Sequence, residues 1–205
     1  MAQPNRRVAL VAALGALMFA AGSATAAPAA PAPGDMTLGD PKAKVQMVEY
    51  ASLSCVHCAA FNNEVFPAFR KKYIDSGKVH YTFREILTPP QQVAAAGFLT
   101  ARCAGKDRYF PILDAMFHEF DAWSQSGDVR ASLLKAGKAG GLSDQQVMAC
   151  VADEKALDAL QTRVAENVKR GDITGTPTFS FNGKAHVGPM TAAELDAAVA
   201  QASKK

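Results

Sequence analysis

The sequence predicts an α/β fold in which a block of helices is inserted between the second strand and a C-terminal β-hairpin. Two β-rich runs at residues 44–51 and 78–85 flank a helical segment, so the chain begins as strand, helix and strand. Residues 91–171 then show helical spacing without a convincing strand. Asn182-Gly183 lies between two further β-rich runs, which indicates a hairpin, and a last helix follows it.

The composition predicts one globular domain with additional terminal segments. The chain has 205 residues, of which 49% are hydrophobic and 20% charged, a balance that excludes a disordered or collagen-like chain. Without Arg6 and Arg7, two of the 22 basic residues, basic and acidic side chains are nearly equal in number. We therefore expect no nucleic-acid partner.

The first 26 residues have the pattern of a secretory signal peptide. Arg6 and Arg7 precede an apolar stretch at residues 8–21, and the small residues 24–26 fit a cleavage site after Ala26. A membrane anchor is the alternative, but the stretch is shorter than the roughly 20 residues that span a bilayer. The arginine pair also permits twin-arginine export, although any basic leader has such residues.

The Ala- and Pro-rich residues 27–37 follow the predicted leader. Their composition predicts an extended tether that contributes nothing to the core. The folded domain is then expected to comprise residues 38–205, with the helical insertion at about 91–171.

The elements around the paired cysteines can be assigned from residue patterns. The run 44–51 is mostly apolar and predicts a strand buried on both faces, with Glu49 either buried at a cost or solvated at an edge. A helix is expected to begin at Cys55-Val56-His57-Cys58 and to be kinked by Pro67.

The later elements have equally local signals. Apolar and polar residues alternate at 78–85, which predicts a half-buried strand. Two capping-box pairs, Ser143 with Gln146 and Thr191 with Glu194, predict the starts of two helices.

Two cysteines separated by two residues at a helix start can perform disulfide exchange. Such exchange requires one thiolate that attacks and a second thiol close enough to resolve the mixed disulfide. We expect Cys55 to attack and Cys58 to resolve, with the helix terminus and a charged His57 lowering the Cys55 pKa. A plain structural bridge and half of a zinc site are the alternatives, but Cys103 and Cys150 provide no second close pair of ligands.

These features together resemble the DsbA-like thiol:disulfide oxidoreductases of the thioredoxin superfamily. The resemblance rests on Cys55-Val56-His57-Cys58 after a buried strand, on Thr176-Pro177 within Gly-Thr-Pro-Thr-Phe before the hairpin, and on the inserted helices. It covers roughly residue 38 to the C-terminus. The family's usual motif has proline and histidine between the cysteines, whereas Val56 is the first intervening residue here.

The resemblance implies roles for residues outside the cysteine motif. Glu49 would lie beneath the active site and assist proton movement at the buried cysteine. The Thr176–Pro177 bond would be cis, in a loop that faces the sulfur atoms and pairs with substrate backbone. Cys103 and Cys150 would form a structural disulfide, as in some relatives, with two buried free thiols as the alternative.

The resulting functional prediction is a periplasmic protein-disulfide oxidoreductase without a cofactor or metal. Its clients would be unfolded or reduced exported proteins, which receive the Cys55–Cys58 disulfide through a mixed disulfide at Cys55 that Cys58 resolves. The resemblance implies reoxidation by a quinone-linked membrane protein. Two alternatives stay open: an isomerase or reductase that acts from the dithiol state, and a non-catalytic metal-handling protein that uses Cys55, His57 and Cys58.

Overall fold

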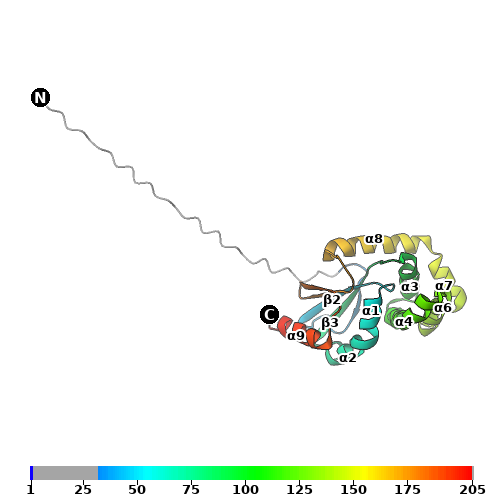
Figure 1. The fold of residues 1–205 in the computed structure, drawn as a ribbon, viewed down its shortest axis with the longest axis horizontal. Helices are drawn as coiled ribbons and strands as arrows, with labels where there is room; N and C mark the ends of the chain where they lie inside the picture. Colours follow the sequence, from blue (N-terminus) through cyan, green and yellow to red (C-terminus); the bar gives the residue numbers. More distant parts are fainter. Residues whose placement is uncertain (2–31, 205) are drawn as a thin grey trace.

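A five-stranded mixed sheet forms the centre of the molecule (Figure 1). The structure, a computed structural model, describes Met1 and residues 32–204, so the predicted signal peptide and most of the predicted tether lie outside the described residues. The strand order is β1-β3-β2-β4-β5, with β2 and β3 parallel and the other neighbours antiparallel. The strands are β1 (Met36–Leu38), β2 (Val45–Ala51), β3 (Val79–Glu85), β4 (Thr178–Phe181) and β5 (Lys184–Val187).

The helix that carries the paired cysteines is irregular. It runs through α1 (Val56–Ala60), the π-helical η1 (Phe61–Val65), α2 (Phe66–Phe69) and the π-helical η2 (Arg70–Ile74). Pro67 lies in the first turn of α2, directly after η1. Because proline has no amide donor and crowds the preceding turn, the regular hydrogen-bond ladder cannot pass through this point.

The helical insertion is confirmed, and it lies between β3 and β4. In Figure 1, α8 lies above the sheet, α9 and α2 lie below it, and most of the inserted helices form a group at one end. The insertion consists of α3 (Gln91–Cys103), α4 (Lys106–His118), α5 (Phe120–Ser126), α6 (Val129–Ala139), α7 (Asp144–Val151) and α8 (Glu154–Gly171), and α9 (Ala192–Ala202) ends the fold.

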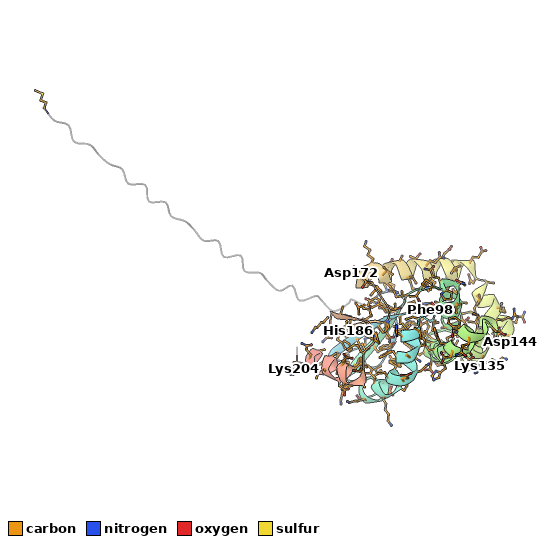
Figure 2. The ribbon with its side chains drawn as sticks, in the orientation of Figure 1. Phe98, Lys135, Asp144, Asp172, His186 and Lys204 are labelled. Carbon is orange, nitrogen blue, oxygen red and sulfur yellow. A yellow bond between two sulfur atoms is a disulfide. The ribbon has the colours of Figure 1, made fainter. Side chains whose placement is uncertain are left out.

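Most of the core is a single apolar cluster that continues from the sheet into the insertion. It includes Met47, Tyr81 and Phe83 from the sheet and Phe98 from α3, which lies in the interior of the molecule (Figure 2). A smaller cluster, formed by Val48, Tyr50 and Ile86, covers the other face of the sheet. The central strands β2 and β3 are therefore buried on both faces, as the apolar run of β2 predicts.

The prediction that β3 is half-buried is wrong. All of its residues except His80 are buried, including Thr82 and Arg84, the latter with 1% of its side chain exposed. The Arg84 guanidinium binds the Asp35 carboxylate at 2.9 Å and donates to the Tyr50 hydroxyl. These polar partners lie far away in sequence, so alternation alone could not show that the polar face is covered.

The expected tether of residues 27–37 includes part of the fold, which corrects its boundary. Met36–Leu38 forms β1, which pairs with β3, and Met36 is buried. Gly39 then turns the chain with a φ of +85°, where a Cβ would lie 2.5 Å from the Val79 carbonyl oxygen. The insertion consequently follows the third strand of the chain rather than the second.

Local turn and cap signals are confirmed. Asn182 and Gly183 have φ values of 47° and 89°, as a tight hairpin requires. Both capping boxes form, at Ser143 before α7 and at Thr191 before α9. Each of these features depends on residues that are close in sequence.

Candidate active site

Cys55 lies at the junction between the central strand β2 and the first turn of α1. It is the N-cap residue, with an extended backbone, and it is partly exposed. The preceding loop is held by buried hydroxyls: Ser54 donates to the Thr88 carbonyl at 2.6 Å, and the Ser52 hydroxyl accepts from the Thr88 amide at 3.2 Å. The loop after β3 therefore fixes the residues that present Cys55.

The environment of Cys55 favours its thiolate. Its pKa is lowered from 9.0 to about 5, mainly by a hydrogen bond with the Cys58 thiol and against the opposing effect of burial. The side chain of Thr176 and the backbone amides of Cys58 and His57 lower the pKa further. At neutral pH the reduced protein therefore presents a nucleophilic sulfur at the start of the helix.

Cys58 has the opposite environment. Its side chain is 0% exposed, and burial is the main reason that its pKa is raised well above 9.0. A charge on Cys55 or Glu49 raises the pKa further. In the reduced state Cys58 consequently stays a neutral thiol that can donate to Cys55.

Glu49 is buried on β2 rather than solvated at an edge. It is 2% exposed, and burial raises its pKa from 4.5 to about 8, although a hydrogen bond from the Tyr81 hydroxyl partly opposes the shift. The charge on Cys55 raises the pKa further. Near neutral pH this carboxyl can therefore exchange a proton with its surroundings.

The loop before β4 brings Thr176 and Pro177 to the cysteines. The Thr176–Pro177 bond is cis, as the resemblance implies. The Cys55 Sγ atom lies 3.4 Å from the Thr176 carbonyl oxygen, although the two residues are 121 positions apart. The Pro177 carbonyl accepts a hydrogen bond from the Gly188 amide at 2.8 Å, which ties the loop to the end of β5.

His57 is exposed, and it acts on Cys55 through its backbone amide. The largest causes that lower the Cys55 pKa come from Cys58, Thr176 and the backbone amides, and the contribution of the His57 ring charge stays a prediction. Val56, 57% exposed, and Val187, 54% exposed, add apolar surface near the cysteines and the Gly175–Pro177 loop. These two valines thus give the surface around the Cys55 sulfur a partly apolar character.

Cys103 and Cys150 are joined by a disulfide, as the resemblance implies. Their Cα atoms are 5.9 Å apart, and the bond connects the last residue of α3 to α7. Both ends lie in the helical insertion, so the bridge braces the insertion while Cys55 and Cys58 stay free.

The described residues contain neither a cluster suited to a metal ion nor a helix suited to a membrane. Between residues 32 and 204, no group of three or more histidine, cysteine or acidic side chains is arranged to hold a metal ion. No helix in the same part of the chain combines the length and the apolar character needed to cross a bilayer.

Sequence reasoning did not find Tyr81, Ser52, Ser54 and Thr88 as parts of the site. Tyr81 fits the apolar pattern of β3, and the two serines fit an ordinary loop. Tyr81 and Glu49 lie on the same face of the sheet because of the register in which the parallel strands β2 and β3 pair. A pattern within one strand does not contain that register.

Comparison with known proteins places the fold in a family. The family model described as Thioredoxin matches residues 31–201. The chain belongs to the thioredoxin family. Among solved structures of this family's fold, it is similar to alpha-DsbA1 of Wolbachia pipientis, with a TM-score of 0.76, 28% identity and coverage of 85% of this chain and 93% of that one. BdbD of Bacillus subtilis shares the fold, with a TM-score of 0.74, 19% identity and coverage of 88% and 99%.

Thioredoxin-family relatives from Rickettsia are similar in sequence. The chain is 34% identical over 150 residues to a protein of Rickettsia bellii described as a "putative protein-disulfide oxidoreductase", covering 73% of this chain and 57% of that protein. A Rickettsia typhi protein of the same description is 35% identical, with 73% and 55% covered. The chain thus spans a little more than half the length of these curated relatives. The chain has the DsbA-like variant of the thioredoxin fold, in which helices are inserted before the terminal hairpin.

Proposed function

We propose that this protein is a protein-disulfide oxidoreductase that acts as an oxidant, donating a Cys55–Cys58 disulfide to exported proteins. The contrast between the two cysteines carries the proposal: one sulfur is stabilised as a thiolate and its partner as a buried thiol. Stabilising the Cys55 thiolate stabilises the reduced protein relative to the disulfide. The pair therefore tends to take electrons from a client.

The proposed exchange consists of two thiolate attacks that together transfer two electrons from the client to the protein. A client thiolate attacks the Cys55 sulfur, the Cys55–Cys58 bond breaks, and Cys58 leaves with the electron pair. A second client thiolate then attacks the client sulfur of the mixed disulfide and releases the Cys55 thiolate. The client gains a disulfide, and the protein gains two electrons and one proton at Cys58. The resolving role expected for Cys58 thus belongs to the reverse direction, in which it attacks Cys55.

The surface around Cys55 supports an extended client segment. The Gly175–Pro177 loop lies at the Cys55 sulfur, and its backbone can pair with client backbone independently of sequence. Val56 and Val187 add exposed apolar contacts. Such a surface suits unfolded, reduced proteins, which expose apolar residues and free backbone groups.

The compartment and the reoxidising partner are also part of the proposal. A leader at residues 1–26 and a structural disulfide suit an exported protein in an oxidising periplasm. The resemblance suggests a quinone-linked membrane protein as the oxidant that restores the disulfide. N-terminal sequencing of the periplasmic protein is expected to begin at or near Ala27, and an intact Met1 would contradict cleavage.

The decisive experiment is the reduction potential of the Cys55–Cys58 couple, measured in glutathione buffers. We expect a value less negative than about −200 mV, together with oxidation of reduced ribonuclease. A potential near the thioredoxin value of about −270 mV, with insulin reduction, would instead identify a reductase. Stoichiometric zinc or copper without activity on either substrate would favour a metal-handling protein.

A further inference from the structure

The buried carboxyl of Glu49 is joined to a hydroxyl on the neighbouring strand. Tyr81 of β3 donates to the Glu49 Oε2 atom at 2.6 Å, and both side chains are buried. The Tyr81 ring packs against Phe66 of α2 and Phe110 of α4, at centroid distances of 4.9 and 6.1 Å. These ring contacts keep the Tyr81 hydroxyl within hydrogen-bonding distance of the Glu49 carboxyl.

Tyr81 also forms part of the wall of a cavity of about 590 Å³ between β1, α2 and α4. Phe66 and Phe110 line the same cavity, together with the polar side chains of Asn62, Asp114 and His118. Asp114 and His118 are exposed, so the cavity reaches solvent. Tyr81 therefore stands between the buried carboxyl and a polar, water-accessible space.

This cavity and the proposed client surface lie toward opposite edges of the sheet. The cavity is bounded by β1, at one edge, whereas the Gly175–Pro177 loop precedes β4 on the other side of β2. In the mixed disulfide a client segment covers Cys55 and the loop. Protons that reach Cys58 during exchange need a path that the client does not block.

A proton is required at Cys58 because the sulfur leaves as a thiolate into a buried site. Cys58 is fully buried, and burial and the charge on Glu49 both disfavour its thiolate. A neutral Glu49 carboxyl can supply a proton, but the carboxylate that remains is itself buried and costly. The carboxyl must be reprotonated within the same step, because a carboxylate left there takes the proton back from Cys58 and allows Cys58 to re-form its bond with Cys55.

We propose that Tyr81 is a proton-relay residue that connects Glu49 to the cavity between β1, α2 and α4. The inference rests on the proposed exchange at Cys55 and Cys58. Glu49 gives its proton to the Cys58 thiolate, Tyr81 gives its hydroxyl proton to the Glu49 carboxylate, and Tyr81 takes a proton from water in the cavity. One solvent proton thus reaches Cys58, and reoxidation returns it by the same route. Burial raises the Tyr81 pKa well above 10.0, so the hydroxyl relays protons without remaining ionised.

The test measures the first exchange step alone. Oxidised protein is mixed with excess peptide that contains one cysteine, quenched with acid, and assayed by mass spectrometry for the mixed disulfide between pH 5 and 9. Tyr81→Phe keeps the ring and removes the hydroxyl. We expect the rate to fall about tenfold or more, as when a positioned acid-base group is removed, with an altered pH profile. Infrared titration should show the Glu49 carboxyl ionising at a higher pH than about 8, because a hydrogen bond that lowers its pKa is lost.

Tyr109 supplies a matched control. Its hydroxyl donates to the buried Glu85 at 3.1 Å, so Tyr109→Phe removes a similar bond at a site without cysteines. We expect this variant to keep the wild-type rate and pH profile. Equal rates in Tyr81→Phe and wild type would overturn the relay.

A double-mutant cycle separates a relay from general damage to the fold. In a Glu49→Gln background, Tyr81→Phe should have no further effect, because the group through which it acts is gone. The same loss of rate in both backgrounds would overturn the relay. If Tyr81→Phe does not fold, Thr37→Trp at the exposed cavity wall is expected to slow exchange, and an unchanged rate would contradict the route. A wild-type protein that forms no mixed disulfide would instead defeat the proposed function.

Discussion

Cys55 and Cys58 belong to the same turn of helix, yet their sulfur atoms have opposite preferences for a proton. Cys55 receives hydrogen bonds at the start of α1, whereas Cys58 lies beneath it in the core. The first sulfur leaves easily from a mixed disulfide because its thiolate is stable. In the proposed exchange the second leaves into the core, where burial disfavours its thiolate, and the relay that we propose supplies the proton through Glu49 and Tyr81.

The hydrogen bond from Cys58 is the largest cause of the low Cys55 pKa. We therefore expect Cys58→Ala to raise the Cys55 pKa above about 5 by more than His57→Ala, which keeps the backbone amide. Titration of the ultraviolet absorbance of the Cys55 thiolate in both variants gives the two pKa values and shows which is higher. A larger rise in His57→Ala would show that the imidazole ring, rather than the neighbouring thiol, activates Cys55.

The stability of the reduced protein should depend on pH through Cys55. The folded pKa of about 5 lies below the ordinary 9.0, so in this range the unfolded chain binds more protons, and the stabilisation falls as pH drops from about 9 to about 5. The oxidised protein lacks this titration and serves as the control. Thermal melts of both forms should show the advantage of the reduced form shrinking toward pH 5. A constant difference across that range would contradict a depressed Cys55 pKa.

At the scale of elements, β1 shows where sequence patterns stop being sufficient. Three residues between an Ala/Pro-rich segment and Gly39 carry too little alternation to predict a strand. They form one because β3 offers a free edge and because Asp35 meets the buried Arg84. The capping boxes and the hairpin could be predicted because the residues that signal them, the two capping pairs and Asn182-Gly183, lie within three positions of each other.

The ion pair between Asp35 and Arg84 should stabilise the fold measurably. Removing the carboxylate by Asp35→Ala leaves a buried guanidinium without this partner, and we expect a loss of about 3 kcal/mol in the free energy of unfolding. Asp75→Ala removes the exposed pair with Arg70 and should cost less than about 1 kcal/mol. Urea denaturation measures both values. Similar losses in the two variants would show that burial of Arg84 does not strengthen the pair.

At the scale of the whole molecule, the order of elements could be predicted and the contacts between distant ones could not. The cysteine motif, the Thr-Pro pair and the hairpin are visible in sequence, so the main residues of the candidate site could be predicted. The register of β2 on β3, which joins Glu49 to Tyr81, comes from packing of the complete sheet. The hydroxyl contacts of Ser52 and Ser54 with Thr88 likewise depend on a loop more than thirty residues away.

The disulfide of the insertion should contribute to stability rather than to chemistry. It closes a loop with a sequence separation of 47, which in the chain-entropy model stabilises the fold by about 4 kcal/mol. The double variant Cys103→Ser with Cys150→Ser should melt at a lower temperature and still form a mixed disulfide at Cys55. Alkylation followed by mass spectrometry of the native protein checks that both sulfurs are bonded. Reactivity at Cys55 that disappears in a folded double variant would contradict this division.

Placing the insertion between β3 and β4 also fixes when the reactive centre is assembled during synthesis. Cys55 emerges early, but Thr176 follows 121 residues later, and β4 must add beside β2 before the two can meet. A chain halted within α8 carries both reactive cysteines and lacks the loop that faces them. A nascent chain therefore gains the complete candidate site only when its C-terminal hairpin has been translated, so under the proposed function its own thiols are ordered before it can act on those of other proteins.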